Sequence, residues 1–227
     1  MTTLTVDEVL TTTRAVRRRM DPSRPVDLDT VIECLDIAVQ APSGGNIQRV
    51  RWMVVTDPGI RASLALLYRE AIAIAMGEQR QPATDKVRSA ARHLGDILQD
   101  VPVLVLVYGV GAPPPNPYRV PGFYGSIIPA IWNFQLALRS RGLGSVYTSS
   151  LNRRDSEVSA LLGVPDDMTQ VAMIPVGHTI GTDFRPAPRP PIEEIAFFDH
   201  WGAARRHRAR PPGTGARSST IPETMEE

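Results

Sequence analysis

The residues best suited to chemistry form one short stretch, from Ala41 to Gln48. Pro42 ends the preceding helical pattern, because its ring removes a backbone donor and blocks the next helical turn. Gly44 and Gly45 permit a sharp turn in which backbone N–H groups approach a ligand closely. Three uncharged side chains add donors and acceptors: Ser43, Asn46 and Gln48. This set suits a neutral heteroaromatic ring edged with carbonyls and ring nitrogens. Taken alone, however, the stretch is better explained as a polar loop between a helix and a strand.

Arginine-rich segments are the second feature that could take part in chemistry. Lys86 is the sole lysine among 25 lysine and arginine residues, a bias that a genome-wide codon preference would also produce. Arg14 and Arg17 open an arginine-rich segment near the N-terminus, and Arg189 precedes two prolines near the C-terminus. A guanidinium fork binds phosphate through paired, charge-assisted hydrogen bonds. A solvated basic face is the simpler explanation of each segment, but three such arginines together could hold one phosphate.

The bulk composition is that of an ordinary globular protein. The 227 residues are 42% hydrophobic and 22% charged, and the formal net charge of +1 gives no reason to expect nucleic acid or an anionic membrane as partner. Cys34 is the sole cysteine, so we expect a core residue, no internal disulfide and no metal site. Early acidic residues argue against a signal peptide, and the longest apolar run, 101–110, is too short for a bilayer. We therefore expect a cytoplasmic protein.

Hydrophobic periodicity predicts helices alternating with a few strands. A capping box at Thr5 and Glu8 starts the first helix, and Asp27 or Asp29 can cap the second. Several strands need not be parallel, so the pattern favours an α+β domain over a doubly wound sheet. The expected helices cover residues 6–13, 28–41, 60–76, 85–98, 126–138 and 153–162. The expected strands cover residues 51–55, 103–107, 145–150 and 169–176, and a short final element covers 192–201.

Three segments stand apart from that regular pattern. The helix at 126–138, with Ser126 as its cap, is apolar almost all round, which indicates a central core helix or one at a subunit interface. The proline-rich loop at 111–121 is too long for a simple connector and predicts a lid or an interface arm. We expect one domain over residues 1–201 and a disordered Arg/Pro-rich tail over 202–227.

Read in order, the motifs resemble those of the FMN-dependent nitroreductase family. The matching segments are Arg14–Arg17, Ala41–Gln48, Gly142–Ser145, Pro175–His178 and Arg189–Pro191. The resemblance covers about residues 6–201. It implies an α+β fold with a central, mostly antiparallel sheet flanked by helices, in an interlocked homodimer with two flavin mononucleotides (FMN) at the interface.

The resemblance also implies a role for each motif. Arg14, Arg17 and Arg189 would hold the FMN phosphate beside Ala15, where the family often has serine. The flavin ring would be lined, from the neighbouring chain, by Pro42, Ser43, Gly44, Asn46 and Gln48. Backbone N–H groups near flavin N5 would come from Tyr147, Thr148, Ser149 and Ser150. Because the flavin carries the redox chemistry, no catalytic side chain is required. Tyr124 is a candidate for substrate contact. The family commonly continues with Pro-Trp after Gln48, and here Arg49 and Val50 follow.

The implied activity is that of an FMN-dependent NAD(P)H oxidoreductase. NADH or NADPH and a small-molecule acceptor, such as a nitroaromatic or a quinone, would occupy one pocket in turn. Three alternatives stay open: a specialised relative that fragments flavin or removes halogen, a non-catalytic FMN-binding or storage protein, and an interaction protein whose arginine-rich tail binds an acidic partner.

Overall fold

The computed structural model describes residues 4–77 and 84–203. The chain divides into two compact units, residues 1–186 and 187–227. The first unit contains the sheet and its helices. The described part of the second unit contains one short helix, α8 (Ile192–Ile195), and a contact between the rings of Phe197 and Trp201, whose centroids are 4.8 Å apart. The remainder of the predicted tail, 204–227, lies outside the described residues.

The first unit is built on a five-stranded antiparallel sheet with β5 at its centre. β5 pairs with β3 along most of its length, β2 pairs with the outer edge of β3, and the short strands β1 and β4 pair with the C-terminal end of β5. The strands are β1 (Met20–Asp21), β2 (Val50–Val55), β3 (Val103–Val110), β4 (Leu143–Ser145) and β5 (Met168–Thr179). This arrangement confirms the predicted α+β class and the mostly antiparallel sheet.

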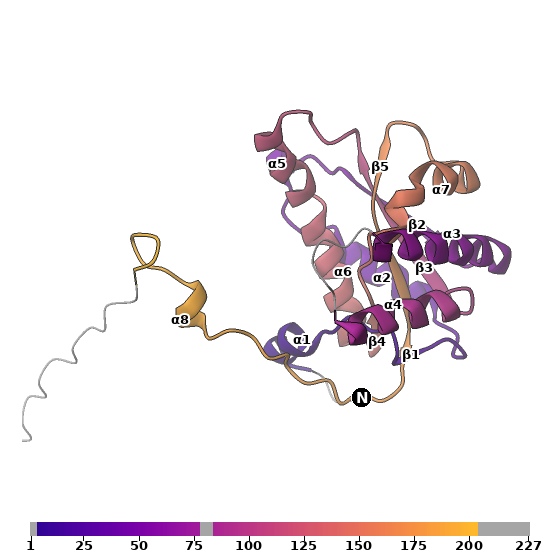
Figure 1. The fold of residues 1–227 in the computed structure, drawn as a ribbon, viewed down its shortest axis with the longest axis horizontal. Helices are drawn as coiled ribbons and strands as arrows, with labels where there is room; N and C mark the ends of the chain where they lie inside the picture. The colour runs from indigo at the N-terminus through magenta and orange to yellow at the C-terminus, as the bar shows by residue number, and fades with distance from the viewer. Residues whose placement is uncertain (1–3, 78–83, 204–227) are drawn as a thin grey trace, which may run out of the picture. The chain divides into compact units, whose positions relative to one another are not determined.

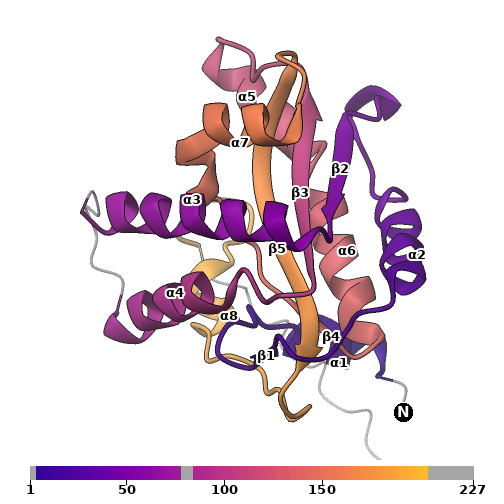
Figure 2. The same ribbon diagram turned by 90° about the vertical axis from the view of Figure 1, so that its right-hand side faces the viewer.

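Helices cover both faces of the sheet, as Figure 2 shows. β3 is buried on both faces because its side chains alternate between two cores. Val103, Val105 and Val107 pack toward α2 (Leu28–Ala38) and α6 (Ile128–Ser140). Leu104, Leu106 and Tyr108 pack on the opposite face. That face is covered by α3 (Pro58–Gly77), α4 (Asp85–Ile97) and α7 (Asp155–Leu162). Figure 1 gives the same elements from a second direction.

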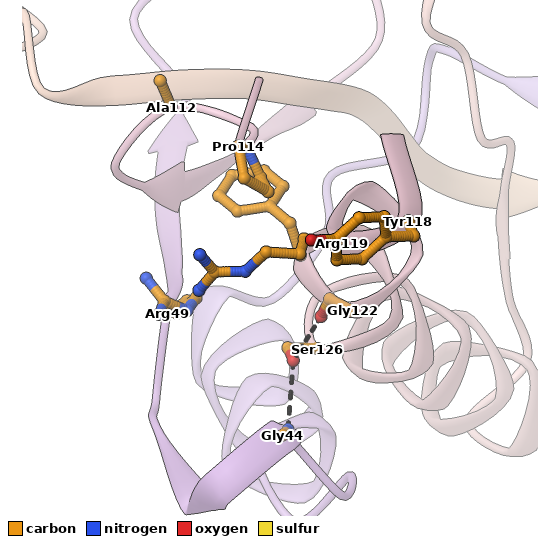
Figure 3. Close-up of a pocket in the computed structure, with 9 residues that line it drawn as sticks. Gly44, Arg49, Ala112, Pro114, Tyr118, Arg119, Gly122 and Ser126 are labelled. Atoms are coloured by element: carbon orange, nitrogen blue, oxygen red, sulfur yellow. Dashed lines mark hydrogen bonds between the residues drawn. The ribbon is translucent and has the colours of Figure 1, made fainter. Parts of the chain in front are cut away.

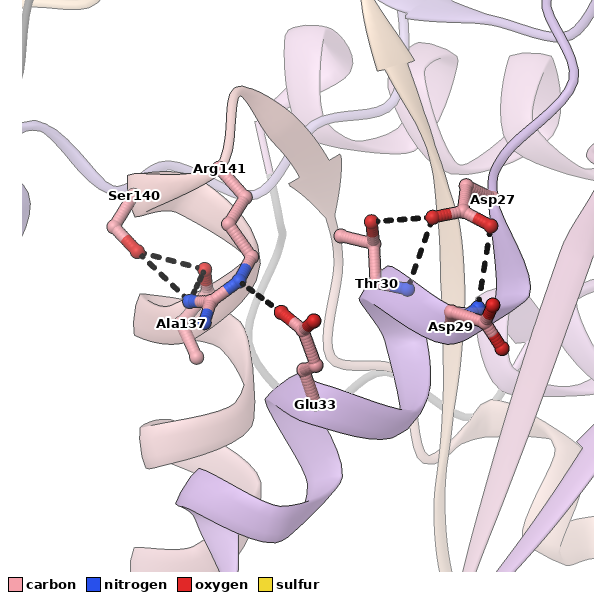
Figure 4. Close-up of polar contacts among 7 residues, drawn as sticks. All are labelled: Asp27, Asp29, Thr30, Glu33, Ala137, Ser140 and Arg141. Atoms are coloured by element: carbon pink, nitrogen blue, oxygen red, sulfur yellow. Dashed lines mark hydrogen bonds and ion pairs between the residues drawn. The ribbon is translucent and has the colours of Figure 1, made fainter.

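Helix ends follow the capping signals in the sequence. Thr5 and Glu8 form the predicted capping box at α1 (Val6–Thr12). Asp27 caps α2 by accepting hydrogen bonds from the backbone N–H groups of Asp29 and Thr30 (Figure 4). The same figure shows the Arg141–Glu33 ion pair, with 3.6 Å between Nε and Oε2, which joins the end of α6 to α2. The remaining short helices are η1 (Gly44–Asn46), η2 (Pro117–Arg119), α5 (Val120–Gly125) and η3 (Ser150–Arg154).

Three predicted elements differ from the structure. The strand at 145–150 is wrong beyond Ser145, because the chain turns into η3 and only Thr148 bridges to Met173. Ser126 is not the cap of α6, since its hydroxyl is engaged by neighbouring backbone groups and Ile127 occupies the cap position. The final element at 192–201 is helical only from 192 to 195.

Cys34 has the predicted core position. It is fully buried against α6, and burial raises the pKa of its thiol to about 11, so the thiolate is scarce at neutral pH. In the part of the chain that the structure describes, no helix is long and apolar enough to cross a membrane. The same residues contain no group of three or more histidine, cysteine, aspartate or glutamate side chains that could hold a metal ion.

Candidate functional site

The polar stretch predicted to contact a ring forms a tight loop, called here the ring loop (Pro42–Gln48). The Gln48 side-chain amide donates hydrogen bonds to Ser43 Oγ at 3.3 Å and to Asn46 Oδ1 at 3.1 Å, so the three polar side chains do meet. Gly45 and Asn46 have φ angles of 62° and 56°, the left-handed region that glycine and asparagine tolerate best. The ring loop is largely exposed and presents its polar groups to solvent.

One hydroxyl anchors the ring loop to the rest of the first unit. The backbone N–H of Gly44 donates to Ser126 Oγ at 3.0 Å, and that hydroxyl donates to the carbonyl of Gly122 at 2.8 Å. The loop therefore rests on the junction between α5 and α6. A side chain at residue 44 would crowd this contact, since its Cβ would lie 3.2 Å from Ser126 Oγ.

The arginine segment (Arg14–Arg19) lies against the β4 end of the sheet. Ala15 bridges to Ser145, and the N–H of Val16 donates to the Ser145 carbonyl at 2.9 Å. Gly144 permits this close approach, because a Cβ at this position would come within 2.5 Å of Thr179 Cγ2 and 3.0 Å of the Val16 methyls. The predicted phosphate-binding arginines are therefore held by backbone pairing with a neighbouring strand.

A pocket of about 340 Å³ opens beside the arginine segment. Its lining contains five cationic side chains and no carboxylate: Arg14, Arg17, Arg18, Arg19 and Lys86. Two of them have protein partners, since Arg19 pairs with Asp183 at 2.7 Å and Arg18 donates to Ser89 Oγ at 2.5 Å. Arg14 and Arg17 are half-buried and form no ion pair with a carboxylate in the described part of the chain. We call this the basic pocket.

Phe184 joins the basic pocket to the end of α6. The guanidinium carbons of Arg19 and Arg139 lie 4.1 and 4.8 Å from the centre of the Phe184 ring. Burial, with a smaller effect from the Arg19 charge, lowers the pKa of Arg139. The guanidinium of Arg139 therefore adds to the four of the arginine segment in the positive potential at this end of the sheet.

From Tyr147 to Ser149, exposed and buried side chains alternate. Thr148 is buried and its N–H donates to the Met173 carbonyl at 3.1 Å, so that N–H is already used by the sheet. Its hydroxyl lies 3.5 Å from Tyr68 Oη. The neighbouring residues Tyr147 and Ser149 are exposed. Of the predicted N–H donors, Thr148 is thus unavailable in this structure.

The two candidate tyrosines lie close enough to interact electrostatically. Burial, and to a smaller extent the phenol of Tyr124, raises the pKa of Tyr147. Tyr124 also packs edge-on against Phe123, with ring centroids 5.1 Å apart. The predicted substrate contact, Tyr124, thus lies within electrostatic range of Tyr147.

The ring loop and the arginine segment lie at opposite ends of the sheet. The Val110 N–H donates to the carbonyl of Arg49, directly after the ring loop, whereas Ser145 pairs with Val176, which pairs with Val103. Val110 lies seven residues after Val103 in β3, a distance of about 24 Å along an extended strand. The pocket beside the ring loop and the pocket beside the arginine segment share no lining residue, and Figure 2 shows the two ends of the sheet on which they lie.

A second pocket, of about 470 Å³, borders the ring loop at Gly44. Figure 3 shows that Arg49 and Arg119 enter it from different elements. Sequence reasoning missed both arginines as site residues, together with Arg18, Arg19 and Lys86 in the basic pocket. Arg49 was detectable as a departure from the family's usual Pro-Trp, but Arg119 has no distinguishing sequence signal.

Arg189 belongs to the second unit. It is exposed, and its Nη1 donates to the carbonyl of Pro188 at 3.1 Å. Its part in phosphate binding stays a prediction.

Comparison with known proteins decides the family. Residues 10–178 match the model of the nitroreductase family. The chain belongs to the nitroreductase family, which is a family of enzymes.

Among curated members, it is 30% identical over 193 residues to the 5,6-dimethylbenzimidazole synthase of Rhodospirillum rubrum, covering 81% of this chain and 83% of the synthase. It is 26% identical to the iodotyrosine deiodinases of Drosophila melanogaster and Thermotoga neapolitana, covering 75% and 80% of this chain. The aligned region spans 61% of the Drosophila protein and 91% of the Thermotoga protein.

Solved structures show the same fold. An iodotyrosine deiodinase bound to FMN and 3-iodo-L-tyrosine superposes with a TM-score of 0.63 at 23% identity, covering 82% of this chain and 96% of that one. A point mutant of the FMN- and NADPH-dependent nitroreductase NfnB gives a TM-score of 0.64 at 22% identity, covering 86% of this chain and 99% of that one. These members of the nitroreductase fold bind or depend on FMN.

Proposed function

We propose that this member of the nitroreductase family is an FMN-dependent NAD(P)H oxidoreductase that acts on a small electrophilic acceptor. The observation that carries the proposal is the basic pocket. Arg14 and Arg17 are half-buried there without a carboxylate partner among the described residues, so a dianionic phosphate would relieve their mutual repulsion. The residues present therefore fit the phosphate end of FMN.

The ring loop fits the other end of the same cofactor. Ser43, Asn46 and Gln48 are uncharged and are joined by hydrogen bonds around a tight turn, where Asn46 and Gln48 are exposed and Ser43 is half-buried. They would position the ring by hydrogen bonds without placing a full charge next to it. When bound, FMN would supply two-electron transfer between NAD(P)H and the acceptor.

We propose further that each flavin site is shared by two chains. The ring loop and the basic pocket lie at opposite ends of one sheet, so a single FMN would contact the ring loop of one protomer and the arginine segment of its partner. Exposed apolar side chains on the neighbouring helices α2 and α6 support a dimer. They are Leu28, Ile32, Ile37, Ile128 and Trp132, each 42% to 53% exposed.

The chain's residues would then act by binding and orientation. Arg14 and Arg17 would fix the phosphate, with Arg189 as a further proposed ligand. Exposed Tyr147 and Ser149, together with Ser150, would offer backbone N–H groups at one edge of the ring, where a donor stabilises developing negative charge. Tyr124, within electrostatic range of Tyr147, would border the acceptor.

The visible spectrum of the purified protein tests the proposal. We expect the absorption bands of bound FMN, their loss when NADH or NADPH is added without oxygen, and their return on addition of a nitroaromatic or quinone. Colourless protein that does not take up added FMN would refute it. Tight FMN binding without oxidation of either NADH or NADPH would instead identify a storage or binding protein.

Reductive dehalogenation is the second candidate, because relatives at 26% identity are iodotyrosine deiodinases. Iodide release from 3-iodo-L-tyrosine under reducing conditions is its direct assay. Release of iodide faster than reduction of any nitroaromatic or quinone would favour this candidate. Formation of 5,6-dimethylbenzimidazole from FMN in the same preparation would favour the flavin-fragmenting alternative.

A further inference from the structure

Two like charges share the pocket beside the ring loop. Arg49 follows the loop directly and Arg119 ends η2. Both line the same pocket, and Figure 3 shows the Arg119 side chain extending toward Arg49. No carboxylate belongs to the lining of this pocket, which consists of described residues only. Neighbouring guanidinium groups repel each other in the absence of an anion, and a bound anion converts that repulsion into two attractions. The pocket thus has the charge arrangement of an anion site.

Both arginines retain donors for a ligand. Arg49 is half-buried, and its side-chain hydrogen bond to the described part of the chain is a long contact of 3.5 Å from Nη1 to the Val110 carbonyl. Arg119 is exposed and forms no ion pair with a carboxylate among the described residues. Each guanidinium has five N–H donors, so most of them can still bind a carboxylate.

The remaining walls of the pocket suit a flat ring. Its lining includes the buried Phe123 together with Pro114 and Tyr118. Tyr118 is 81% exposed, so its ring can pack against a planar ligand. An amino acid would leave its ammonium group without a carboxylate partner here. The lining therefore favours a simple acid over a zwitterion.

We propose that this pocket selects an electron acceptor that carries a carboxylate on a planar ring, and that Arg49 and Arg119 bind that carboxylate. The proposal rests on the proposed function, since it assigns the acceptor of the same site. Gly44 belongs to both the pocket and the ring loop, so an acceptor bound by the two arginines lies beside the loop proposed to contact the flavin.

The test compares 4-nitrobenzoate with 4-nitrobenzamide, which differ in charge but little in shape. Titration calorimetry on the purified protein, without NAD(P)H, should give a Kd for the acid at least about ten-fold below that for the amide. The Arg49→Gln, Arg119→Gln double variant should lose this preference and keep its affinity for the amide. Arg92→Gln, which removes an exposed arginine from α4, is the matched control and should bind both compounds like the parent protein.

Steady-state kinetics distinguishes an effect on binding of the acceptor from an effect on binding of the nicotinamide donor. The double variant should raise KM for 4-nitrobenzoate at least about ten-fold, with KM for NAD(P)H unchanged. Equal binding of acid and amide by the parent protein, or a preference that survives in the double variant, would overturn the inference. A loss confined to NAD(P)H would also overturn it, because the anion would then be the donor's pyrophosphate. Selective binding of the acid without any NAD(P)H oxidation would refute the proposed function and leave the carboxylate site standing.

Discussion

The N–H of Gly44 and the hydroxyl of Ser126 form a hydrogen bond of 3.0 Å between positions 82 residues apart. Ser126 also donates to the Gly122 carbonyl, so one hydroxyl ties the ring loop to the last turn of α5. The conformation of the candidate ring-binding loop therefore depends on a residue with no predicted role in binding.

Ser126→Ala should weaken FMN binding and cost about 1 kcal/mol of unfolding free energy, because it leaves the part-buried Gly44 N–H without its acceptor. FMN titration by fluorescence and urea unfolding measure the two effects. Ser140→Ala, which removes a hydroxyl from the other end of α6, is the control and should leave FMN affinity unchanged. Normal FMN affinity in Ser126→Ala would show that the loop does not need this anchor.

Arg14→Gln and Arg17→Gln should each lower FMN affinity by about ten-fold or more, since each removes a charge-assisted hydrogen bond to phosphate. The effect should shrink as salt screens the remaining charges. Equilibrium dialysis at two ionic strengths measures it. Arg92→Gln serves as the control for loss of one positive charge. An unchanged Kd in the Arg14, Arg17 double variant would remove the basic pocket from the flavin site.

Gly144→Ala should destabilise the first unit by about 1–3 kcal/mol, because the new Cβ would overlap Thr179 and press on Val16. The displaced arginine segment should also bind FMN more weakly. Chemical denaturation measures the unfolding free energy of this variant and of the control Gly125→Ala, where a Cβ meets no atom within 4 Å. The difference between the two variants isolates the steric effect. Equal stability of the two variants would contradict the close approach of the N-terminal segment.

Tyr108→Phe should be neutral or stabilising by up to about 1 kcal/mol at pH 7, because Tyr108 Oη is buried without a hydrogen-bond partner among the described residues. Burial also raises the pKa of the Tyr108 phenol, so above about pH 10 ionisation favours the unfolded chain and the parent protein loses stability as the pH rises. The Tyr108→Phe variant should lose less stability over the same pH range. Thermal melting from pH 7 to 11, with exposed Tyr118→Phe as control, measures the difference. Parallel curves for parent and variant would count against a neutral, buried phenol.

Ile32→Glu with Trp132→Glu should convert a dimer into monomers and abolish FMN binding together, if both flavin sites form between chains. Light scattering after size exclusion gives the mass. The control is Leu66→Glu, which places the same charge on an exposed apolar position of α3, over the opposite face of the sheet. A monomeric double variant that keeps full FMN affinity would show that one chain completes the site.

The features that the sequence by itself determined are those set by interactions between residues close together in the chain. Periodicity, capping residues and glycines depend on neighbours a few positions away. The cap at Thr5 and the doubly buried strand β3 could therefore be predicted without a fold, and the cap of α2 was narrowed to Asp27 or Asp29. The sequence also indicated a turn rich in uncharged polar groups at 42–48, whereas the hydrogen bonds from Gln48 to Ser43 and Asn46 are seen only in the structure.

Long-range contacts decided the rest. The predicted strand at 145–150 is reduced to a single bridge between Thr148 and Met173 of β5. In that bridge the Thr148 N–H donates to the Met173 carbonyl, a partner that is distant in the sequence. Packing of α5 on the ring loop gives Ser126 its acceptor role, and the fold brings Arg119 into the same pocket as Arg49. Strand register alone separates the ring loop from the arginine segment by the length of β3. No local pattern encodes that separation, because it arises only when strands distant in sequence align.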